Sequence, residues 1–396
     1  MIWAATELPA IAGGNPIRES MLPYGRHSLD DRDIDAVVRT LNSGTLTGGD
    51  AVAAFEAALA TEYGVRHAVA CSSGTAALQM ALRAVGVGLR TSVVVPPLSF
   101  VATANAALLV GATPRFADIG GDRCLDPEAA ARVVEPSTAA VITVDYSGLP
   151  SDVSALRACL PQGLPIIVDA AHSLGAHTTG RPPVVHGDIT ILSFHPVKHI
   201  TTGEGGATLT DDDDLAHRLR RLRNHGMTSE AGERAGLTWR YDVLELGENH
   251  RLSDMQAALG TAQLTRLQAW VARRRELASR YDELLETVPG IVPPPRAPGR
   301  ESAWHLYAIE VTEDFGMARD PVIDGLRAEN IAATLHYPAI HLLSMYRRLG
   351  HQVGEAPVAE ATCSRLVTLP LFPAMTDADQ DGVVEAITRL RRWGGG

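Results

Sequence analysis

Short apolar segments alternate with longer amphipathic segments along roughly the first half of the chain. The short segments have the length and apolar content of buried strands, and apolar residues recur at helical spacing in the two clearest segments between them, 74–87 and 101–110. The expected strands are residues 67–71, 92–95, 114–117, 139–144, 165–169, 189–193 and 206–210. This alternation predicts an α/β fold with a mostly parallel sheet, and such sheets bind ligands beyond the carboxyl ends of their strands.

The pattern changes after residue 251. A long helical stretch rich in Leu, Ala and Arg comes first, and a proline-rich connector follows it. The elements expected in this part are that helical stretch, the connector, one strand and two helices, at residues 252–287, 289–295, 303–311, 321–329 and 377–392. We therefore expect an N-terminal segment (1–25), a large domain (26–251) and a smaller α+β C-terminal domain (252–396), with a disordered end at 394–396.

The composition is that of a globular protein long enough to form two domains. Of the 396 residues, 45% are hydrophobic and 20% are charged. A net charge of −11 argues against nucleic-acid binding, which needs a basic surface. Four cysteines lie far apart without CxxC spacing, so we expect reduced thiols and a cytoplasmic protein. We expect no signal peptide, and no apolar run is long enough to cross a membrane.

Lys198 is the single lysine of a chain that uses arginine at its other basic positions. Of the 35 Lys and Arg residues, the other 34 are arginine. Arginine stays protonated, whereas a desolvated lysine amine can lose its proton and form a covalent bond with a carbonyl group. Small, flexible residues follow it at 203–206 (Gly-Glu-Gly-Gly), as a lysine facing a cofactor needs. That Lys198 is the only lysine does not by itself distinguish a reactive lysine from an ordinary surface lysine that remains in an arginine-rich chain.

Two further groups fall at the ends of expected strands. Residues 72–77 form a strand-to-helix turn, where Gly74 lets the backbone approach an anion and the helix start offers free N–H groups. Asp169 ends an apolar strand, where a carboxylate can keep a pyridine nitrogen protonated. Taken singly, the turn fits an ordinary helix N-cap and Asp169 a capping residue. A phosphate turn, a strand-end aspartate and an isolated lysine, in this order, together match the requirements of a pyridoxal phosphate (PLP) site.

Metal and dinucleotide sites are less well supported. His195 and His199 lie four residues apart, but Pro196 opposes the helix that would align them. The glycine-rich run at 203–206 leads into a strand rather than a helix, so the dinucleotide fingerprint is absent. The acidic run at 211–214 suits a helix start better than a metal site, and we expect no bound metal.

Motifs spread over nearly the whole chain follow the order of one known family. They are residues 43–49 (SGTLTGG), 73–77 (SGTAA), 97–105 (PLSFVATAN), 169–172 (DAAH), 193–206, 247–254 (GENHRLSD), 336–338 (HYP) and 369–373 (LPLFP). In these motifs the chain resembles the DegT/DnrJ/EryC1/StrS family of sugar aminotransferases. The resemblance implies PLP-dependent transferase fold type I (aspartate-aminotransferase-like), with a large domain and a smaller C-terminal domain.

The resemblance also implies roles for residues around the cofactor ring. Lys198 is expected to form the internal aldimine with PLP, and Asp169 to pair with the pyridine nitrogen. Phe100 is expected to stack on the ring, with His172 near it. Some relatives carry histidine in place of the lysine and are dehydratases, so the lysine here favours transamination.

The phosphate of the cofactor is expected to contact residues of two subunits. By the resemblance, Gly74, Thr75 and Ser193 bind it within one subunit. Asn249 is expected to reach it from the neighbouring subunit of a homodimer.

The expected activity is the ping-pong transfer of an amino group from an amino acid, L-glutamate, to a nucleotide-linked keto sugar, in amino sugar or antibiotic biosynthesis. Residues 144–148 and 193–206 are closest to the branch that aminates C4 of UDP-linked 4-keto-6-deoxy sugars, whereas residues 13–18 look like other branches. The alternatives are a keto-cyclitol as the acceptor, a PLP lyase or dehydratase of the same fold, and a PLP-binding scaffold protein without turnover.

Overall fold

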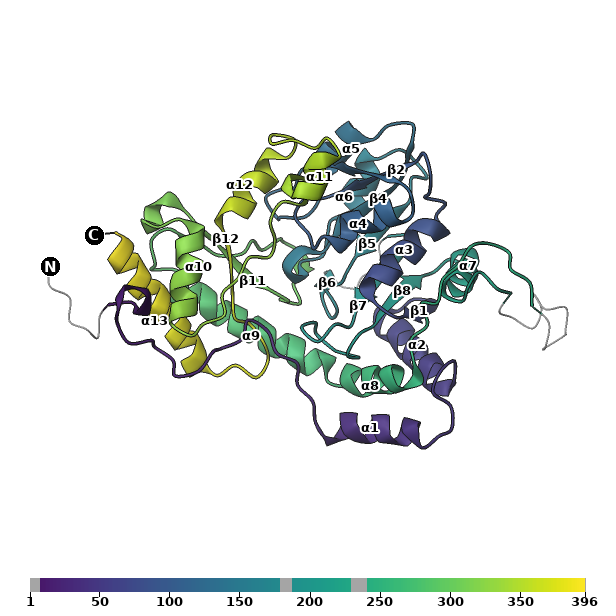
Figure 1. The fold of residues 1–396 in the computed structure, drawn as a ribbon, viewed down its shortest axis with the longest axis horizontal. Helices are drawn as coiled ribbons and strands as arrows, with labels where there is room; N and C mark the ends of the chain where they lie inside the picture. The colour runs from purple at the N-terminus through teal and green to yellow at the C-terminus, as the bar shows by residue number, and fades with distance from the viewer. Residues whose placement is uncertain (1–7, 179–186, 229–240, 396) are drawn as a thin grey trace.

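The computed structural model describes residues 8–178, 187–228 and 241–395, and a seven-stranded sheet lies at its centre (Figure 1). The strand order across the sheet is β1-β8-β7-β5-β4-β2-β3. These strands are β1 His67–Cys71, β2 Ser92–Val95, β3 Thr113–Phe116, β4 Thr138–Val144, β5 Ile166–Asp169, β7 Ile189–Ser193 and β8 Gly206–Thr210. Because β8 alone runs antiparallel to its neighbours within this sheet, the expected mostly parallel sheet is confirmed.

Helices cover both faces of this sheet. On one face lie α3 (Gly74–Ala84), α4 (Ala102–Leu109) and α7 (Asp213–Arg223). On the other lie α2 (Asp50–Tyr63), α5 (Pro127–Val133), α6 (Val153–Cys159) and α8 (Asp254–Leu264). Burial on both faces explains why the inner strands β4, β5 and β7 are mostly apolar runs, whereas the edge strand β3 alternates exposed and buried positions.

Local conformation decides where these helices begin and end. The helix expected at 74–87 stops at Ala84, since Gly86 then adopts a left-handed conformation with φ 87°. The acidic run is a helix start as expected, because the side chain of Asp212 accepts a hydrogen bond from the backbone N–H of Leu215 at the beginning of α7.

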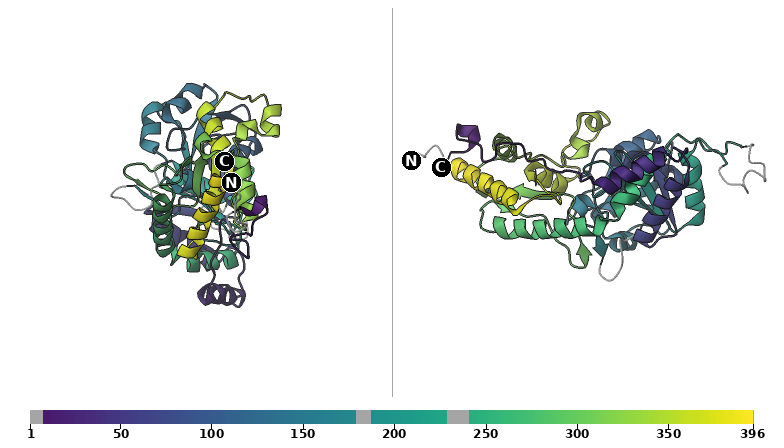
Figure 2. Two further views of the ribbon diagram at one scale, coloured as in Figure 1. Left: turned by 90° about the vertical axis from the view of Figure 1, so that its left-hand side faces the viewer. Right: turned by 90° about the horizontal axis from the view of Figure 1, so that it is seen from below.

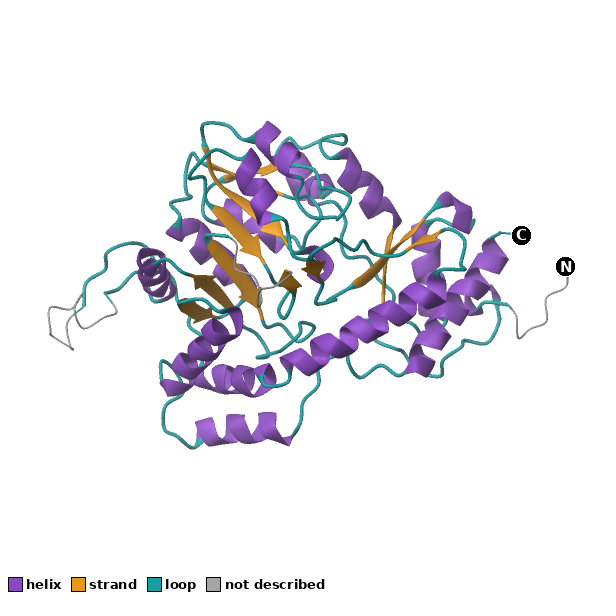
Figure 3. Cartoon of the chain, turned by 180° about the vertical axis from the view of Figure 1, so that it is seen from behind, coloured by secondary structure: helices purple, strands orange, loops and turns teal. Residues whose placement is uncertain are grey.

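A second part of the molecule surrounds a three-stranded antiparallel sheet. Its strands, in spatial order, are β12 (Leu366–Leu369), β11 (Tyr307–Val311) and β9 (Ile291–Val292). Helices α10 (Arg319–Ala328) and α13 (Asp377–Gly394) pack with it around a separate apolar core. Figures 2 and 3 show this part at one end of an elongated molecule, joined to the large sheet by the long helix α9 (Leu267–Leu285).

Some expectations for this second part differ from the structure. The helical stretch 252–287 is two helices, with a turn at Thr265 and Arg266 between α8 and α9. The connector 289–295 contains the short strand β9, and the strand expected at 303–311 begins only at Tyr307. Gly394 ends α13 instead of belonging to a disordered end.

The segment before helix α1 (Asp31–Leu41) runs along α10. Glu329, which is fully buried, accepts hydrogen bonds from the backbone N–H groups of Ala10 (2.7 Å) and Ile17 (2.8 Å). One carboxylate therefore fixes two points of the N-terminal segment to the second part.

The remaining elements are short. They are β6 (His177–Thr178), β10 (Arg300–Glu301), α11 (Ser344–Arg348), α12 (Pro357–Arg365) and 3-10 helices at Ala10–Ala12, Tyr146–Gly148, Glu313–Phe315 and Ile340–Leu342. Among the residues that the structure describes, no helix combines the length and the apolar character needed to cross a membrane. The expected domain limits at residues 25 and 251 remain a prediction.

Candidate active site

One cavity at the carboxyl ends of β5 and β7 collects most of the residues expected to form the site. Its volume is about 390 Å³, which is in the range typical of small-ligand sites. Seven of the eight expected residues line it: Gly74, Thr75, Phe100, Asp169, His172, Ser193 and Lys198. The fold thus brings distant positions together at one edge of the sheet, where ligands of α/β proteins bind.

The turn between β1 and α3 forms one wall of the cavity. The Ser73 hydroxyl accepts a hydrogen bond from the backbone N–H of Ala76 (3.1 Å), which caps α3. A Cβ added to Gly74 would lie 2.9 Å from the Cβ of Ser193 at the end of β7. Only glycine permits this close packing, which leaves the first N–H groups of α3 next to the Ser193 hydroxyl. Such a helix start can bind an anion.

Asp169 is a buried carboxylate at the end of β5. It accepts hydrogen bonds from the Thr103 hydroxyl (2.8 Å) and the Ala171 backbone N–H (3.2 Å), and the Ser99 hydroxyl lies 2.7 Å from that of Thr103. Burial raises the pKa of Asp169, while the bonds from Thr103 and Ala171 lower it. Thr103 was not expected to bind Asp169, and Ser99 was not expected to contact Thr103, because both contacts depend on the fold.

Lys198 lines the same cavity and has an unusually acidic amine. Burial lowers its pKa from 10.5 to about 8, and the negative charge of Asp169 opposes that decrease. The Lys198 Nζ lies 3.5 Å from the Nε2 of His305. A neutral amine is therefore a substantial fraction of Lys198 near neutral pH, as expected for a lysine that reacts with carbonyl groups.

Three buried histidines, His172, His199 and His305, form a cluster beside Lys198. The ring of His305 lies 4.4 Å from that of His172 and 5.6 Å from that of His199, measured between centroids. Burial holds the pKa of each well below its usual value, helped by the positive charge of Lys198 and, for His199, first by that of Arg274, so the histidine cluster is neutral. His305 was not expected at the site, since no motif marks it.

Aromatic residues line the open side of the cavity. Phe100 is 55% exposed, and its ring lies 5.8 Å from that of Tyr337. The Tyr337 hydroxyl is 3.3 Å from the Nε2 of His172. Tyr24 and His336 also line this side, with ring centroids 4.9 Å apart. Such a wall can stack on a flat ring and hydrogen-bond a polar ligand.

Asn249, the eighth expected residue, is not among those that line the cavity. It is exposed, and it forms an isolated antiparallel bridge with Asn224. Its role in a neighbouring subunit stays a prediction.

The chain matches known proteins over nearly its full length. The model of the DegT/DnrJ/EryC1/StrS aminotransferase family matches residues 27–388. The spore coat polysaccharide biosynthesis protein SpsC of Bacillus subtilis is 38% identical over 379 residues, which are 93% of this chain and 97% of SpsC.

Solved structures agree in fold. DesI, solved in the presence of its TDP-sugar product, has a TM-score of 0.88 at 33% identity, covering 99% of this chain and 97% of DesI. The PLP form of the putative sugar aminotransferase Spr1654 of Streptococcus pneumoniae has a TM-score of 0.86 at 28% identity, covering 94% of this chain and 99% of Spr1654. The chain therefore belongs to the DegT/DnrJ/EryC1/StrS aminotransferase family and is a sugar aminotransferase that depends on pyridoxal phosphate.

Proposed function

We propose that this enzyme transfers an amino group from L-glutamate to a keto sugar linked to a nucleotide. The observation that carries the proposal is the position of the single lysine. The Lys198 amine, with a pKa lowered by burial, lies in the cavity that also holds Asp169 and the Gly74 turn. The TDP-sugar product in the DesI structure supports a nucleotide-linked sugar as the acceptor.

The residues of the cavity fit pyridoxal phosphate. The glycine at position 74 keeps the start of α3 open to a phosphate, and the histidine cluster has Nδ1 atoms without a partner among the described residues. The proposed contacts are Gly74, Thr75 and Ser193 with the phosphate, Asp169 with the pyridine nitrogen, Phe100 and His172 with the ring, and Lys198 with the aldehyde carbon. When bound, the cofactor supplies a carbonyl group for amines and an electron-withdrawing ring.

We assign Lys198 a second role as the group that moves a proton. With a pKa of about 8, both its protonated and its neutral form are populated near neutral pH, as general acid–base catalysis requires. Lys198 would remove the proton from the α-carbon of glutamate and later give one to the sugar carbon that receives the nitrogen. His305, 3.5 Å away and neutral, would accept a hydrogen bond from the amine and orient it.

Asp169 must stay ionised although it is buried. A buried carboxyl group tends to be protonated, which raises its pKa. The Thr103 hydroxyl and the Ala171 N–H oppose this by donating hydrogen bonds to the carboxylate. We infer that the hydrogen bonds from Thr103 and Ala171 keep Asp169 ionised, so that its negative charge can stabilise a protonated pyridine nitrogen of the cofactor.

The proposed enzyme is a homodimer. Asn249 is exposed and is not part of the cavity of its own chain. A residue in this position is available to complete the cavity of a second subunit, as the resemblance implies for the phosphate contact.

Borohydride reduction of the PLP-loaded protein, followed by peptide mapping, tests the cofactor site. A pyridoxyl group on Lys198 is expected, and none in Lys198→Arg, which keeps the positive charge. Incubation with glutamate and a TDP- or UDP-linked 4-keto-6-deoxy sugar should release 2-oxoglutarate and form an amino sugar. In Lys198→Arg the rate should fall by at least about 100-fold. A wild-type protein without a pyridoxyl group on Lys198, or without 2-oxoglutarate release, would contradict the proposal.

A further inference from the structure

Arg274 is a buried arginine in the helix α9, which joins the two parts of the molecule (Figure 1). Its exposed fraction is 2%, and no carboxylate of the described residues counters its charge. Burial lowers its pKa from 12.5 to about 10, so the side chain is still positively charged near neutral pH. A buried charge without an opposite charge is unfavourable for folding. Arg274 therefore depends on hydrogen bonds to neutral groups.

Backbone carbonyl groups take the place of a carboxylate around Arg274. Its Nη1 donates hydrogen bonds to the carbonyl oxygens of Leu371 (2.8 Å) and Trp304 (3.2 Å), and the carbonyl oxygen of His305 lies 3.5 Å away. Its Nε has no partner among the described residues. These contacts join α9 to the segment that precedes β11, 30 residues further along the chain. Arg274 thus fixes the backbone of Trp304 and His305.

The backbone at Trp304 has an unfavourable conformation. Its φ of 52° lies in the left-handed region, which a bulky residue adopts only where its surroundings hold it there. The Trp304 ring is buried in the core of the second part, while the His305 N–H donates a hydrogen bond to the Ser147 carbonyl oxygen (3.0 Å) of the 3-10 helix after β4. A Cβ added to Gly148 would lie 2.7 Å from the nitrogen of Trp304, so only glycine permits this approach. Both parts of the molecule therefore fix this segment.

The segment brings the His305 ring next to Lys198. The Nε2 of His305 lies 3.5 Å from the Lys198 Nζ, and a histidine nitrogen accepts a hydrogen bond only when it carries no proton. Burial and the positive charge of Lys198 contribute most to the lowered pKa of His305. The other bases around it, His172, His199 and Arg274, lower it further. Arg274 thus acts on His305 both through the backbone that positions it and through a charge that disfavours its protonation.

We propose that Arg274 is a positioning residue for amino transfer, which holds His305 where its Nε2 accepts a hydrogen bond from the Lys198 amine. Arg274 is not among the residues that line the cavity of Lys198, so it acts through His305 rather than on the substrate. The inference rests on the proposed function, in which Lys198 moves the proton. It gives α9, a helix that connects the two parts, a role in fixing the direction of the Lys198 amine.

The reaction with glutamate alone tests this role. PLP-loaded Arg274→Met lacks the charge and the donors, so in a single turnover at saturating glutamate it should release 2-oxoglutarate about 100-fold more slowly than the wild type. The glutamate concentration at half the maximal rate should change by less than about threefold, because Arg274 does not touch the substrate. Arg274→Lys keeps the charge and should recover at least about tenfold of the lost rate. An unchanged rate in Arg274→Met, or no recovery in the lysine variant, would overturn the proposal.

The matched control is Arg273→Met. Arg273 precedes Arg274 in α9 and also donates a hydrogen bond to a backbone carbonyl of the second part, that of Met375 (3.0 Å). Its variant should react at the wild-type rate, and an equal loss in both variants would contradict a specific role of Arg274. If urea titration shows that Arg274→Met does not fold, Arg274→Gln, whose amide keeps one donor without the charge, replaces it with the same expected results.

A double-mutant cycle tests whether Arg274 acts through His305. His305→Gln removes the imidazole, so adding Arg274→Met to it should slow 2-oxoglutarate release by less than about threefold further. If the two losses multiply instead, Arg274 acts by another route and the proposal is refuted.

A measurement on the cofactor-free protein separates this inference from the proposed function. 15N NMR of histidine-labelled protein shows which ring nitrogen carries the proton, and the signals of His305 are those missing in His305→Gln. Near neutral pH the Nε2 of His305 should carry no proton in the wild type, and its signal should shift toward that of a protonated nitrogen in Arg274→Met. A wild-type proton on Nε2 would overturn the inference. An Nε2 without a proton, together with no pyridoxyl group on Lys198, would overturn the proposed function and leave the arrangement of Arg274 and His305 in place.

Discussion

The amine of Lys198 should titrate near pH 8 in the cofactor-free protein, far below an ordinary lysine. Burial lowers its pKa from 10.5 to about 8, although the negative charge of Asp169 acts in the other direction. At pH 7 about a tenth of the amines are then neutral, which is about 300-fold more than for a lysine of ordinary pKa. Since the neutral amine is the nucleophile, Lys198 should react with amine reagents under conditions where exposed lysines do not.

The chain offers an unusually clean assay for this pKa. Because Lys198 is the only lysine, reductive methylation with 13C-formaldehyde labels one side chain, and the α-amino group gives a separate signal. The 13C shift of the methyl groups, followed from about pH 6 to about pH 10, gives the pKa of the amine. The cofactor is removed beforehand, so the result does not depend on activity.

Asp169→Asn is the informative perturbation. Removal of the negative charge takes away the stabilisation of the ammonium form, so the pKa of Lys198 should fall by about one unit below the wild-type value. Asp169→Glu keeps the charge and should titrate close to the wild type. A wild-type midpoint near 10.5, or an unchanged or higher midpoint in Asp169→Asn, would refute the reasoning.

Three further predictions concern the same cavity. Gly74→Ala places a Cβ 2.9 Å from that of Ser193, so PLP affinity, measured by fluorescence titration, should fall by at least about tenfold, whereas unaltered affinity would contradict a phosphate at this turn. Thr103→Val removes one donor to Asp169 and should lower kcat by about tenfold or more, with Thr103→Ser restoring most of it, and failure of the serine variant would point to a packing role instead. The histidine cluster has folded-state pKa values below those of the unfolded chain, so the unfolded chain binds more protons below about pH 6.5. In urea titrations below about pH 7, where Lys198 is mostly protonated in both states, the free energy of unfolding should therefore fall below about pH 6.5 by up to about 1.4 kcal/mol per pH unit for each histidine. The raised pKa values of Asp145 and Asp169 oppose this decrease but involve fewer protons, and a flat profile would show that the cluster is not neutral.

The large sheet and the centre of the site could be predicted because their signals are local. Strands buried on both faces form apolar runs. Asp169 ends one such run, and Lys198 stands between another, at 189–193, and the glycine-rich residues 203–206. Thr103 and His305 lacked such a signal, because their contacts with Asp169 and Lys198 join positions 66 and 107 residues apart. A contact of this kind exists only once the fold is formed.

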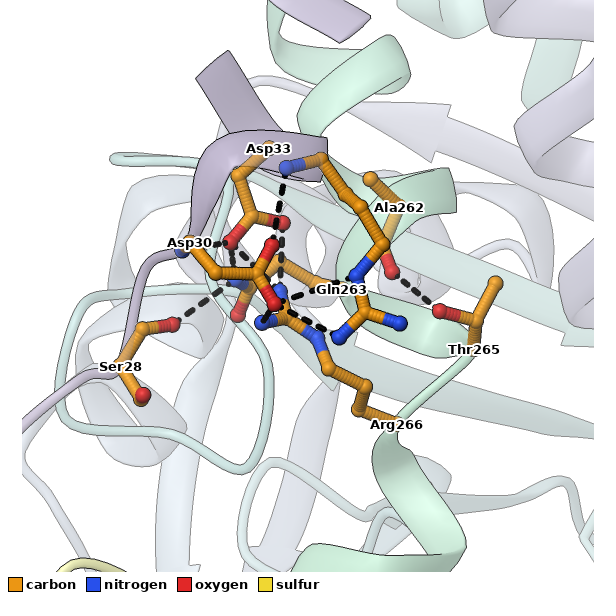
Figure 4. A network of polar contacts seen from close by, with 8 residues as sticks. Ser28, Asp30, Asp33, Ala262, Gln263, Thr265 and Arg266 are labelled. Atoms are coloured by element: carbon orange, nitrogen blue, oxygen red, sulfur yellow. Dashed lines mark hydrogen bonds and ion pairs between the residues drawn. The ribbon is translucent and has the colours of Figure 1, made fainter. Parts of the chain in front are cut away.

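Helix boundaries and orientation were harder to predict. Arg266, at the break between α8 and α9, forms ion pairs with Asp30 and Asp33 (Figure 4), and no local pattern reveals these contacts. Helix α1 itself was not among the expected elements. Its apolar periodicity would in any case predict an inward stripe, whereas the buried ion pairs of Asp33 turn that stripe outward.

Glu329 has a practical consequence for handling the protein. Its buried carboxylate accepts hydrogen bonds from the backbone N–H groups of Ala10 and Ile17, which take the place of water molecules. Cutting the chain after residue 17 would remove both donors, so that water would have to replace their hydrogen bonds to the carboxylate. Affinity tags therefore belong before Ala10 or after α13, where they leave both hydrogen bonds to Glu329 in place.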